Sequence, residues 1–298
     1  MEKIGIVTIT YNSSHVIEGF LDSALCQSFR NFVIYIVDNA SDDDSVMLAN
    51  QRNDDRINII SNSSNVGVAK ANNQGIHLAI KEGCTQILIM NNDVEFEEHL
   101  IEKMIQVQED QGSSLISPKI KYFDHPEYIW YAGSEFVKTR GFLPIHRGNT
   151  QKDIGQFEGV SQVEYAPTCC LLIKKEVFQD VGFMDEKYFV YFDDTDFLYR
   201  VLMDGRHKLV YFSHVDFYHK VGSLTKSFEG KYRGDFFIKY NTRNHIYFLK
   251  KSVKIYGYIF IIFLFFRNNI KFIFSQNIRK NIRTWLLINR SYFEGIRM

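Results

Sequence analysis

QILIMNNDVE, residues Gln86–Glu95, is the stretch that decides the fold. Its apolar run from Ile87 to Met90 stops abruptly at Asn91-Asn92-Asp93. A short, unbroken apolar run followed by turn formers is typical of a buried parallel strand that ends in a polar loop. Because open α/β sheets bind ligands at the carboxyl ends of such strands, Asp93 is a candidate for a metal or phosphate site. The alternative is that Asp93 only caps the helix predicted around Leu100.

On both sides of this strand, apolar runs alternate with helical patterns. Strand-like runs cover residues 3–9, 32–37 and 57–60, and helical patterns cover 16–25, a short segment after the polar cluster 39–45, and 68–82. This alternation predicts an α/β fold with a mostly parallel central sheet and helices on both faces. The strand ends at residues 8–12, Asp38 and Asp93 then line one edge of the sheet.

The pattern loosens after Gly112. A strand-like run at 128–132 leads into a loop that continues to about Thr150, and this loop either shapes a substrate or merely connects elements. Further strands are predicted at 169–173, 208–212 and 215–219, with a helix at 175–181.

A second acidic cluster follows the aromatic run at 188–192. Asp193, Asp194 and Asp196 stand at the start of a predicted helix that ends at Gly205, where the helix dipole favours negative charge. Aromatic surroundings raise a carboxyl pKa, as a general base requires. The alternative is an acidic helix cap in which Asp196 pairs with Arg200 on the surface.

His219 ends the last predicted strand and is a candidate metal ligand. His214, also near a strand end, is its competitor, because a single histidine is more often structural than ligating.

The formal net charge of +0 hides a strong asymmetry. Residues 1–219 hold 19 basic and 32 acidic side chains, whereas residues 220–298 hold 16 and 3. An acidic body with a basic, aromatic tail indicates that the two parts meet different partners. The four cysteines show no CxxC spacing, so reduced thiols in a cytosolic protein are the simpler interpretation, and no signal-peptide pattern precedes the first strand.

The tail begins with a joining segment, residues 239–254, and continues with twelve apolar residues, Ile255 to Phe266. Since about twenty residues are needed to cross a bilayer, this run indicates an interfacial or buried helix. Residues 267–298 combine apolar side chains with seven basic residues and one acidic residue. This composition predicts a helical extension that lies on the surface of a membrane with anionic lipids. The alternative is an ordinary C-terminal helical subdomain that closes the acceptor side of the protein.

Six motifs, in order along the chain, resemble those of the family-two glycosyltransferases of the A-type fold. They are TITYN (8–12), IVDNASDDDS (36–45), NVGVAKANNQG (65–75), ILIMNNDVE (87–95), GFMDEKYFVYFDDTDFLYR (182–200) and HKVGS (219–223). These enzymes build bacterial surface polysaccharides. The resemblance covers about residues 3–223 and implies a catalytic domain at 1–225 and an extension at 226–298. It implies an inverting transferase that moves a sugar, with dTDP-rhamnose as the first candidate donor, to a lipid-linked glycan at the inner face of the membrane. Galactosyl, glucosyl and N-acetylhexosaminyl donors remain alternatives.

The resemblance also implies a role for particular residues. The nucleotide-sugar donor is expected at Thr10, Tyr11, Asn12, Asp38, Asn65, Gly67, Asn72 and Asn92. Asp93 looks like the remaining carboxylate of the Asp-any-Asp metal motif, whose first position is Asn91 here. Mg²⁺ or Mn²⁺ ligation is therefore expected at Asp93 and His219. Asp194 is expected to be the base, with Asp193 beside it.

Four other classes are weighed against this one. Residues 11–15 contain no Gly and no Lys, which argues against a sugar-1-phosphate nucleotidyltransferase, and no GxGxxG follows a strand, which argues against a dinucleotide dehydrogenase. Nucleic-acid binding is disfavoured, because the aromatic residues of the tail lie within apolar runs. A silent scaffold that binds a glycan or nucleotide stays open, and release of nucleoside diphosphate would separate it from an enzyme.

Overall fold

The computed structural model describes residues 2–220, 234–274 and 278–298, with side chains omitted for 278–281. An eight-stranded sheet forms the centre, in the order β11-β13-β6-β12-β4-β1-β2-β3. Its N-terminal half consists of β1 (Ile4–Thr10), β2 (Phe32–Asp38), β3 (Ile57–Ser61) and β4 (Gln86–Met90), all parallel to their neighbours within this half. The predicted alternation of strands and helices is confirmed here.

The other half of the sheet is mixed. β6 (Leu115–Pro118) and β13 (Leu209–Phe212) pair in parallel, whereas β12 (Cys170–Lys174) runs antiparallel to both β4 and β6. β11 (Val160–Gln162) adds an antiparallel edge that the sequence did not predict.

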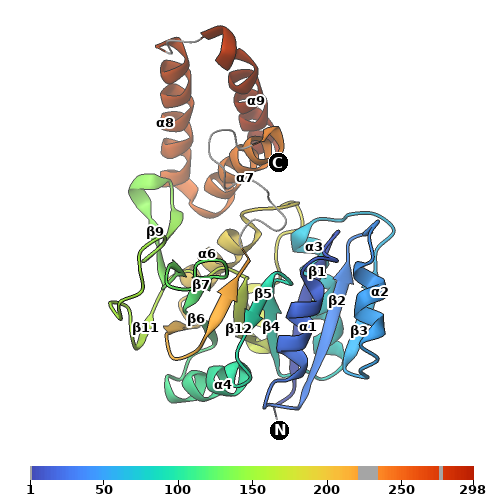
Figure 1. Ribbon diagram of the computed structural model, residues 1–298. Coiled ribbons are helices and arrows are strands. Elements are labelled where there is room, and N and C mark those ends of the chain that lie inside the picture. Colours follow the sequence, from blue (N-terminus) through green and yellow to red (C-terminus); the bar gives the residue numbers. More distant parts are fainter. Residues whose placement is uncertain (1, 221–233, 275–277) are drawn as a thin grey trace.

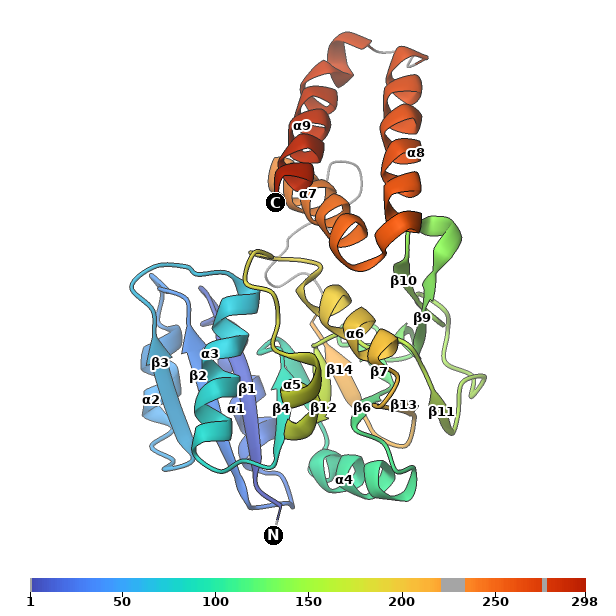
Figure 2. The same cartoon turned by 180° about the vertical axis from the view of Figure 1, so that it is seen from behind.

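Helices cover both faces of the sheet, as predicted. Figure 1 shows α1 (Ile17–Leu25) in front of β1 and β2, with α2 (Ser45–Gln51) beside β3. Figure 2 shows α3 (Val68–Lys81), α5 (Lys175–Val181) and α6 (Asp193–Asp204) on the opposite face. α4 (Leu100–Asp110) packs near β6. The buried face of α3 includes Ala69, Ile76 and Ala79, and the small side chain of Ala79 lies close to Gly5 of β1.

A second sheet corrects the expected path of the chain after β4. Residues 94–96 form β5 (Val94–Phe96), which joins β14 (Phe217–His219), β7 (Ile120–Tyr122) and β8 (Ile129–Tyr131). The acidic residues in and after β5, Glu95, Glu97 and Glu98, resemble the first turn of a helix, but the helix α4 begins only at Leu100. The expected long loop up to Thr150 was also wrong in part, because β9 (Ser134–Val137) and β10 (Leu143–His146) form a hairpin within it, around the short helix η1 (Lys138–Arg140).

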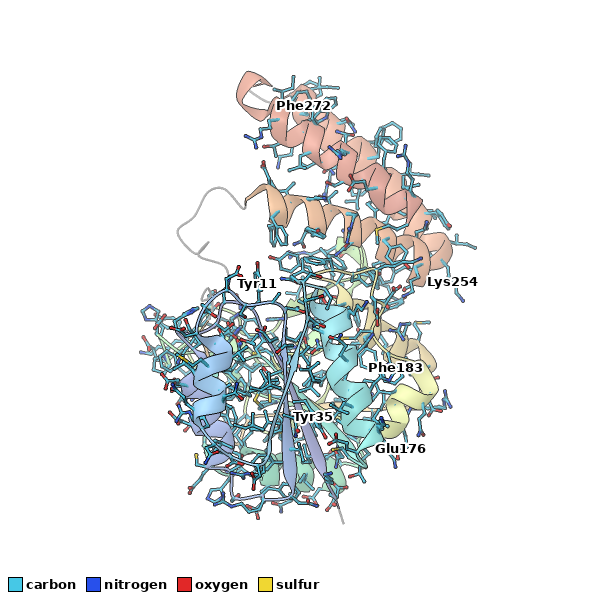
Figure 3. All side chains as sticks on the ribbon, turned by 90° about the vertical axis from the view of Figure 1, so that its right-hand side faces the viewer. Tyr11, Tyr35, Glu176, Phe183, Lys254 and Phe272 are labelled. Carbon is cyan, nitrogen blue, oxygen red and sulfur yellow. The ribbon has the colours of Figure 1, made fainter. Side chains whose placement is uncertain are left out.

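Three helices follow the sheets. The expected joining segment is instead most of α7 (Asp235–Ser252), followed by α8 (Lys254–Ile273) and α9 (Ile278–Arg297). α8 and α9 form a hairpin that stands away from the body at the end opposite the N-terminus (Figure 1). In Figure 3, Tyr11 lies at the end of the body that faces these helices. The carboxyl ends of the parallel strands therefore face the C-terminal helices.

α7 packs against the body that contains the two sheets, and the expected boundary between residues 225 and 226 lies outside the described residues. The Asn244 amide, fully buried, donates to the carbonyl oxygens of Val190 and Tyr191 at 2.8 and 2.9 Å. His245 Nε2 lies 2.8 Å from the carbonyl oxygen of Gly141. These contacts tie α7 to the segment that leads into α6 and to the hairpin of β9 and β10.

α8 is more exposed and longer than its apolar run suggested. The helix continues through Arg267 and Lys271, so it reaches a length and composition that could cross a membrane, and it is the one such helix found in the described ranges. Six side chains at helical spacing are each more than half exposed: Ile255, Ile259, Ile262, Phe266, Ile270 and Ile273. We call these six the α8 row. The expectation of a buried helix was wrong for this face.

Candidate active site

The ends of β1 and β2 bring the first predicted donor-binding residues together. Thr10 and Asp38 are register partners and both are buried. Asp38 Oδ1 accepts a hydrogen bond from the Ser41 hydroxyl at 2.5 Å. Tyr11 is exposed at the edge, and Asn12 next to it has a φ of 52°. A non-glycine residue in this left-handed region carries strain of the kind that collects at functional sites.

The segment before α3 closes over the same edge. The Asn65 side-chain oxygen accepts a hydrogen bond from the Gly67 N–H at 3.0 Å. Gly67 has a φ of 86°, and a Cβ there would lie 2.5 Å from the Phe189 carbonyl oxygen. Only glycine fits this approach between α3 and the segment before α6. Asn72 lies deeper, where its amide contacts the Met184 sulfur at 3.7 Å, so its contact in the structure is with the protein itself.

The end of β4 presents Asn92 and Asp93, both nearly fully buried. Both amide atoms of Asn92 lack a hydrogen-bond partner among the described residues. Asp93 does not cap α4, because β5 intervenes and His99 occupies the N-cap position. The capping alternative is therefore excluded. A buried polar side chain without a protein partner at a strand end indicates a place for a ligand.

His219 is the histidine that meets Asp93. Its Nε2 lies 3.2 Å from Asp93 Oδ1, because β14 pairs with β5 and places His219 opposite Val94. His214 is exposed, and its carbonyl oxygen accepts a hydrogen bond from Lys103. The last three residues of the HKVGS motif, 221–223, lie outside the described residues.

The Asp93 and His219 pair fits a divalent cation with few protein ligands. A carboxylate oxygen and an imidazole nitrogen suit Mg²⁺ or Mn²⁺, with the imidazole favouring Mn²⁺. His219 Nδ1 has no hydrogen-bond partner within the described part of the chain. No group of three or more His, Cys, Asp or Glu side chains there could hold a metal. Most ligands of such an ion would therefore have to come from a bound diphosphate and water.

The second acidic cluster begins α6. Tyr191 and Phe192, with φ values of 63° and 70°, turn the chain sharply just before Asp193 and Asp194. Burial raises the pKa of both carboxyls, and their mutual repulsion raises the pKa of Asp193 further. The Tyr165 hydroxyl donates to Asp194 Oδ2 at 2.6 Å and opposes this rise at Asp194. A carboxyl with a raised pKa can take a proton near neutral pH.

Asp196 has a different role. Its pairing with Arg200 is confirmed at 2.9 Å, but Asp196 is fully buried rather than at the surface. It also accepts hydrogen bonds from Lys251, at 2.9 Å, and from Ser252, at 2.7 Å. Asp196 is thus neutralised by cations from α6 and α7, which leaves Asp193 and Asp194 as the carboxylates available for chemistry.

A series of ring contacts joins the two acidic clusters. The His219 ring lies 4.6 Å from Trp130, and Trp130 lies 4.7 Å from His146. His146 stacks on Tyr165, whose hydroxyl binds Asp194. Cys170 at the start of β12 pairs with Met90 at the end of β4, so the segment that contains Tyr165 lies at the same end of the sheet as Asp93. Through Tyr165, Asp194 is held at this end as well. Sequence reasoning missed Trp130, His146, Tyr165 and Asn244, because no local pattern marks their partners.

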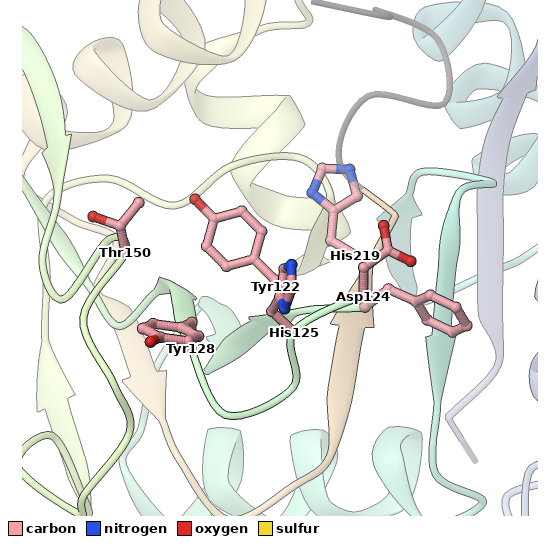
Figure 4. Close-up of a pocket in the computed structure, with 7 residues that line it drawn as sticks. Tyr122, Asp124, His125, Tyr128, Thr150 and His219 are labelled. Carbon is pink, nitrogen blue, oxygen red and sulfur yellow. The ribbon is translucent and has the colours of Figure 1, made fainter. Parts of the chain in front are cut away.

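A cavity of about 440 Å³ opens beside His219 (Figure 4). It is lined by His219 and by Tyr122, Phe123, Asp124, His125, Tyr128 and Thr150.

The family model described as Glycosyl transferase family 2 matches residues 5–182, which is more than half of the chain. The chain belongs to glycosyl transferase family 2. The matched range contains the strand ends of β1, β2 and β4, and the second acidic cluster and His219 follow it.

Relatives within family 2 are distant. The chain is 26% identical to the low-salt glycan biosynthesis hexosyltransferase of Haloferax volcanii over 67% of its own length and 62% of that protein. It is 24% identical to the N-acetylglucosaminyl-diphospho-decaprenol L-rhamnosyltransferase of Mycobacterium tuberculosis over 65% of its length and 69% of that protein. The chain thus spans just under two thirds of the first relative.

The fold is that of the A-type glycosyltransferases. The crystal structure of S. aureus TarS 1–349 superposes with a TM-score of 0.61 over 98% of this chain and 80% of TarS 1–349, at 15% identity. The same protein has been solved in complex with UDP. At this identity the likeness shows the fold alone.

Proposed function

We propose that this protein is an inverting, metal-dependent glycosyltransferase. It moves a sugar from a nucleotide-diphosphate donor, with dTDP-rhamnose as the first candidate, to a hydroxyl of a growing lipid-linked bacterial surface polysaccharide. The observation that carries the proposal is the arrangement of Asp93, His219 and Asp194 at one end of the sheet, linked by ring contacts. The rhamnosyl and lipid-linked parts rest on the name of the mycobacterial relative.

The donor is held by the N-terminal half of the sheet in this proposal. Asp38 and Thr10 face the base and ribose, and Asn92 supplies its two unpartnered amide atoms close to the diphosphate. Asp93 and His219 would hold the cation, Mg²⁺ or Mn²⁺, which would supply positive charge beside the departing diphosphate. The buried setting of Asp93 strengthens this attraction, because the surrounding protein screens charge less than water does.

The acceptor hydroxyl loses its proton to Asp194. Its raised pKa brings the carboxyl closer to neutral pH, where a general base contributes about a hundred- to ten-thousandfold in rate. Attack from the side opposite the departing diphosphate inverts the anomeric centre. Burial and the neighbouring Asp194 carboxyl raise the pKa of Asp193, which favours its neutral form and so limits the repulsion beside the base.

The test is release of nucleoside diphosphate from a panel of donors: dTDP-rhamnose, UDP-glucose, UDP-galactose and UDP-N-acetylglucosamine, each with Mn²⁺ or Mg²⁺. At least one donor is expected to turn over, and Asp194→Asn is expected to reduce turnover by about a hundredfold or more while donor affinity changes little. Asp93→Ala is expected to weaken metal-dependent donor binding as well.

Two outcomes would contradict the proposal. Donor binding without turnover by the wild-type protein would indicate the scaffold alternative. A product that keeps the anomeric configuration of the donor, read by NMR, would exclude inversion.

The proposed site of action is the cytoplasmic face of the membrane, where a lipid-linked acceptor would be presented. The α8 row and the basic residues Lys254, Arg267 and Lys271 on the same helix support a peripheral contact with anionic lipid. The carboxyl ends of the parallel strands face the same direction as these helices, so a membrane-bound protein would turn its active site toward the acceptor.

A further inference from the structure

The cavity beside His219 is part of a fixed framework. Tyr122 and His219 are register partners in β7 and β14, and the Phe123 N–H donates to the His219 carbonyl oxygen at 3.0 Å. The Tyr122 N–H donates to the Tyr128 carbonyl oxygen at 3.1 Å, which closes the turn between β7 and β8. The cavity is therefore held in position relative to the histidine of the proposed metal site.

One wall residue is held in a strained conformation. Thr150 has a φ of 61°, which is rare for a β-branched residue, and its N–H donates to the Ile129 carbonyl oxygen at 2.8 Å. Strain of this kind persists only where the surroundings enforce it, and it collects at binding and catalytic sites.

The walls suit a neutral sugar. Tyr122, Tyr128, Phe123 and two histidine rings supply flat surfaces, and the electron-rich face of an aromatic ring attracts the polarised C–H groups of a pyranose. Lys220 already lies 4.5 Å above the Phe123 ring, which leaves the tyrosines as the stacking surfaces. Asp124 and Thr150 add acceptors for hydroxyl groups, and the Asp124 carboxylate disfavours an anionic ligand. The volume of about 440 Å³ lies within the range of small-molecule sites.

We propose that this cavity binds a neutral pyranose unit of the acceptor glycan. This inference rests on the proposed function and adds to it a second contact with the acceptor, away from the reacting hydroxyl. The seven lining residues include neither Asp193 nor Asp194, so the ring in the cavity is not the one that meets the base. They also include no residue of β1, β2 or α3, and His219, through the proposed cation, is the one lining residue that the proposed function assigns to the donor.

The experiment is saturation-transfer NMR on the full chain with methyl glycosides of glucose, galactose, rhamnose and N-acetylglucosamine as probes. At least one glycoside is expected to bind the wild-type protein at millimolar concentration. Tyr128→Ala is expected to reduce its affinity at least tenfold, and Tyr128→Phe, which keeps the ring, is expected to retain binding. Asp124→Ala provides a second, independent change on an exposed side chain.

Ile154→Ala is the matched control, because Ile154 is an exposed side chain that does not line the cavity. It is expected to bind the glycoside as the wild type does. Circular dichroism confirms that each variant is folded.

Competition distinguishes the source of the sugar. Four nucleotides are tested in the presence of Mg²⁺: UDP, UDP-glucose, dTDP and dTDP-rhamnose. None of them is expected to displace the glycoside. Displacement by a nucleotide sugar but not by its nucleoside diphosphate would assign the cavity to the donor and overturn the proposal. Glycoside affinity that neither Tyr128→Ala nor Asp124→Ala changes would also overturn it. Because this assay needs no turnover, glycoside binding without any donor turnover would contradict the proposed function and leave the cavity assignment standing.

Discussion

At the scale of single residues, the proton affinity of Asp194 depends on Tyr165. Burial raises the pKa of this carboxyl, and the hydrogen bond from the buried Tyr165 hydroxyl lowers it. The bond favours the charged carboxylate, because the carboxylate accepts it and a protonated carboxyl would accept it less well. In the proposed function, Tyr165 is therefore a positioning residue that also sets the pH range in which Asp194 acts as the base.

We expect Tyr165→Phe to move the acid limb of the pH profile of kcat/KM to higher pH. Loss of the hydrogen bond raises the pKa of Asp194, so a smaller fraction is ionised at any pH below that pKa. The measurement is kcat/KM for the donor from pH 5 to 9. Tyr211→Phe is the control, because the Tyr211 hydroxyl binds the Phe157 carbonyl oxygen instead. An acid limb that stays in place would exclude this role for Tyr165.

At the scale of elements, α7 supports the start of α6. The turn through Tyr191 and Phe192 is strained, and the buried Asn244 amide binds the two carbonyl oxygens at Val190 and Tyr191. Each such hydrogen bond contributes about 0.5–1.5 kcal/mol to stability. The conformation that delivers Asp193 and Asp194 therefore depends on a side chain fifty residues later in the chain.

We expect Asn244→Ala to lower kcat about tenfold or more, with little change in the KM for the donor. The turn loses both hydrogen bonds and relaxes, which displaces the base but leaves the strand ends of β1 and β2 intact. Steady-state kinetics measures the change. Asn289→Ala on α9 is the control, since its amide binds only within the C-terminal helices, and it should keep wild-type kcat. An equal loss in both variants would point to general destabilisation.

Sequence patterns predicted the N-terminal half of the molecule because its signals are local. The strands β1, β2 and β4 are mostly apolar runs, and the residues that follow them mark the ligand edge. β5 was missed because three residues are too few to show a period, and its acids look like a helix start. Tyr165 and Asn244 carry no local signal at all, since each matters only through a contact with a distant segment.

At the scale of the whole molecule, charge and apolar surface are separated. The body is acidic, while the C-terminal helices carry the α8 row and most of the excess positive charge. An exposed row of six large apolar side chains on one helix is unusual for a surface that meets only water. Its basic neighbours fit the negative headgroups of a bilayer.

We expect the double variant Ile259→Glu, Phe266→Glu to lose binding to vesicles that contain phosphatidylglycerol, by at least tenfold in a sedimentation assay. Each substitution replaces an apolar group, worth about 1.5–3 kcal/mol when buried, by a charge that anionic lipid repels. Met203→Glu, at an exposed apolar position of α6, should bind as the wild type does. Unchanged sedimentation of the double variant would show that the α8 row is not the lipid contact. A wild-type dimer that the double variant converts to monomer would assign the row to a second copy.

The buried ion pair between Asp196 and Lys251 has a consequence for biosynthesis. A nascent chain that has left the ribosome only as far as residue 219 already contains the sheet, both acidic clusters and His219. It contains Arg200 but lacks Lys251, the second cation on the Asp196 carboxylate, and it also lacks the Asn244 amide that holds the turn before α6. The contacts that hold the turn before Asp193 and Asp194 are therefore complete only once α7 has been synthesised, just before α8 with its exposed apolar row.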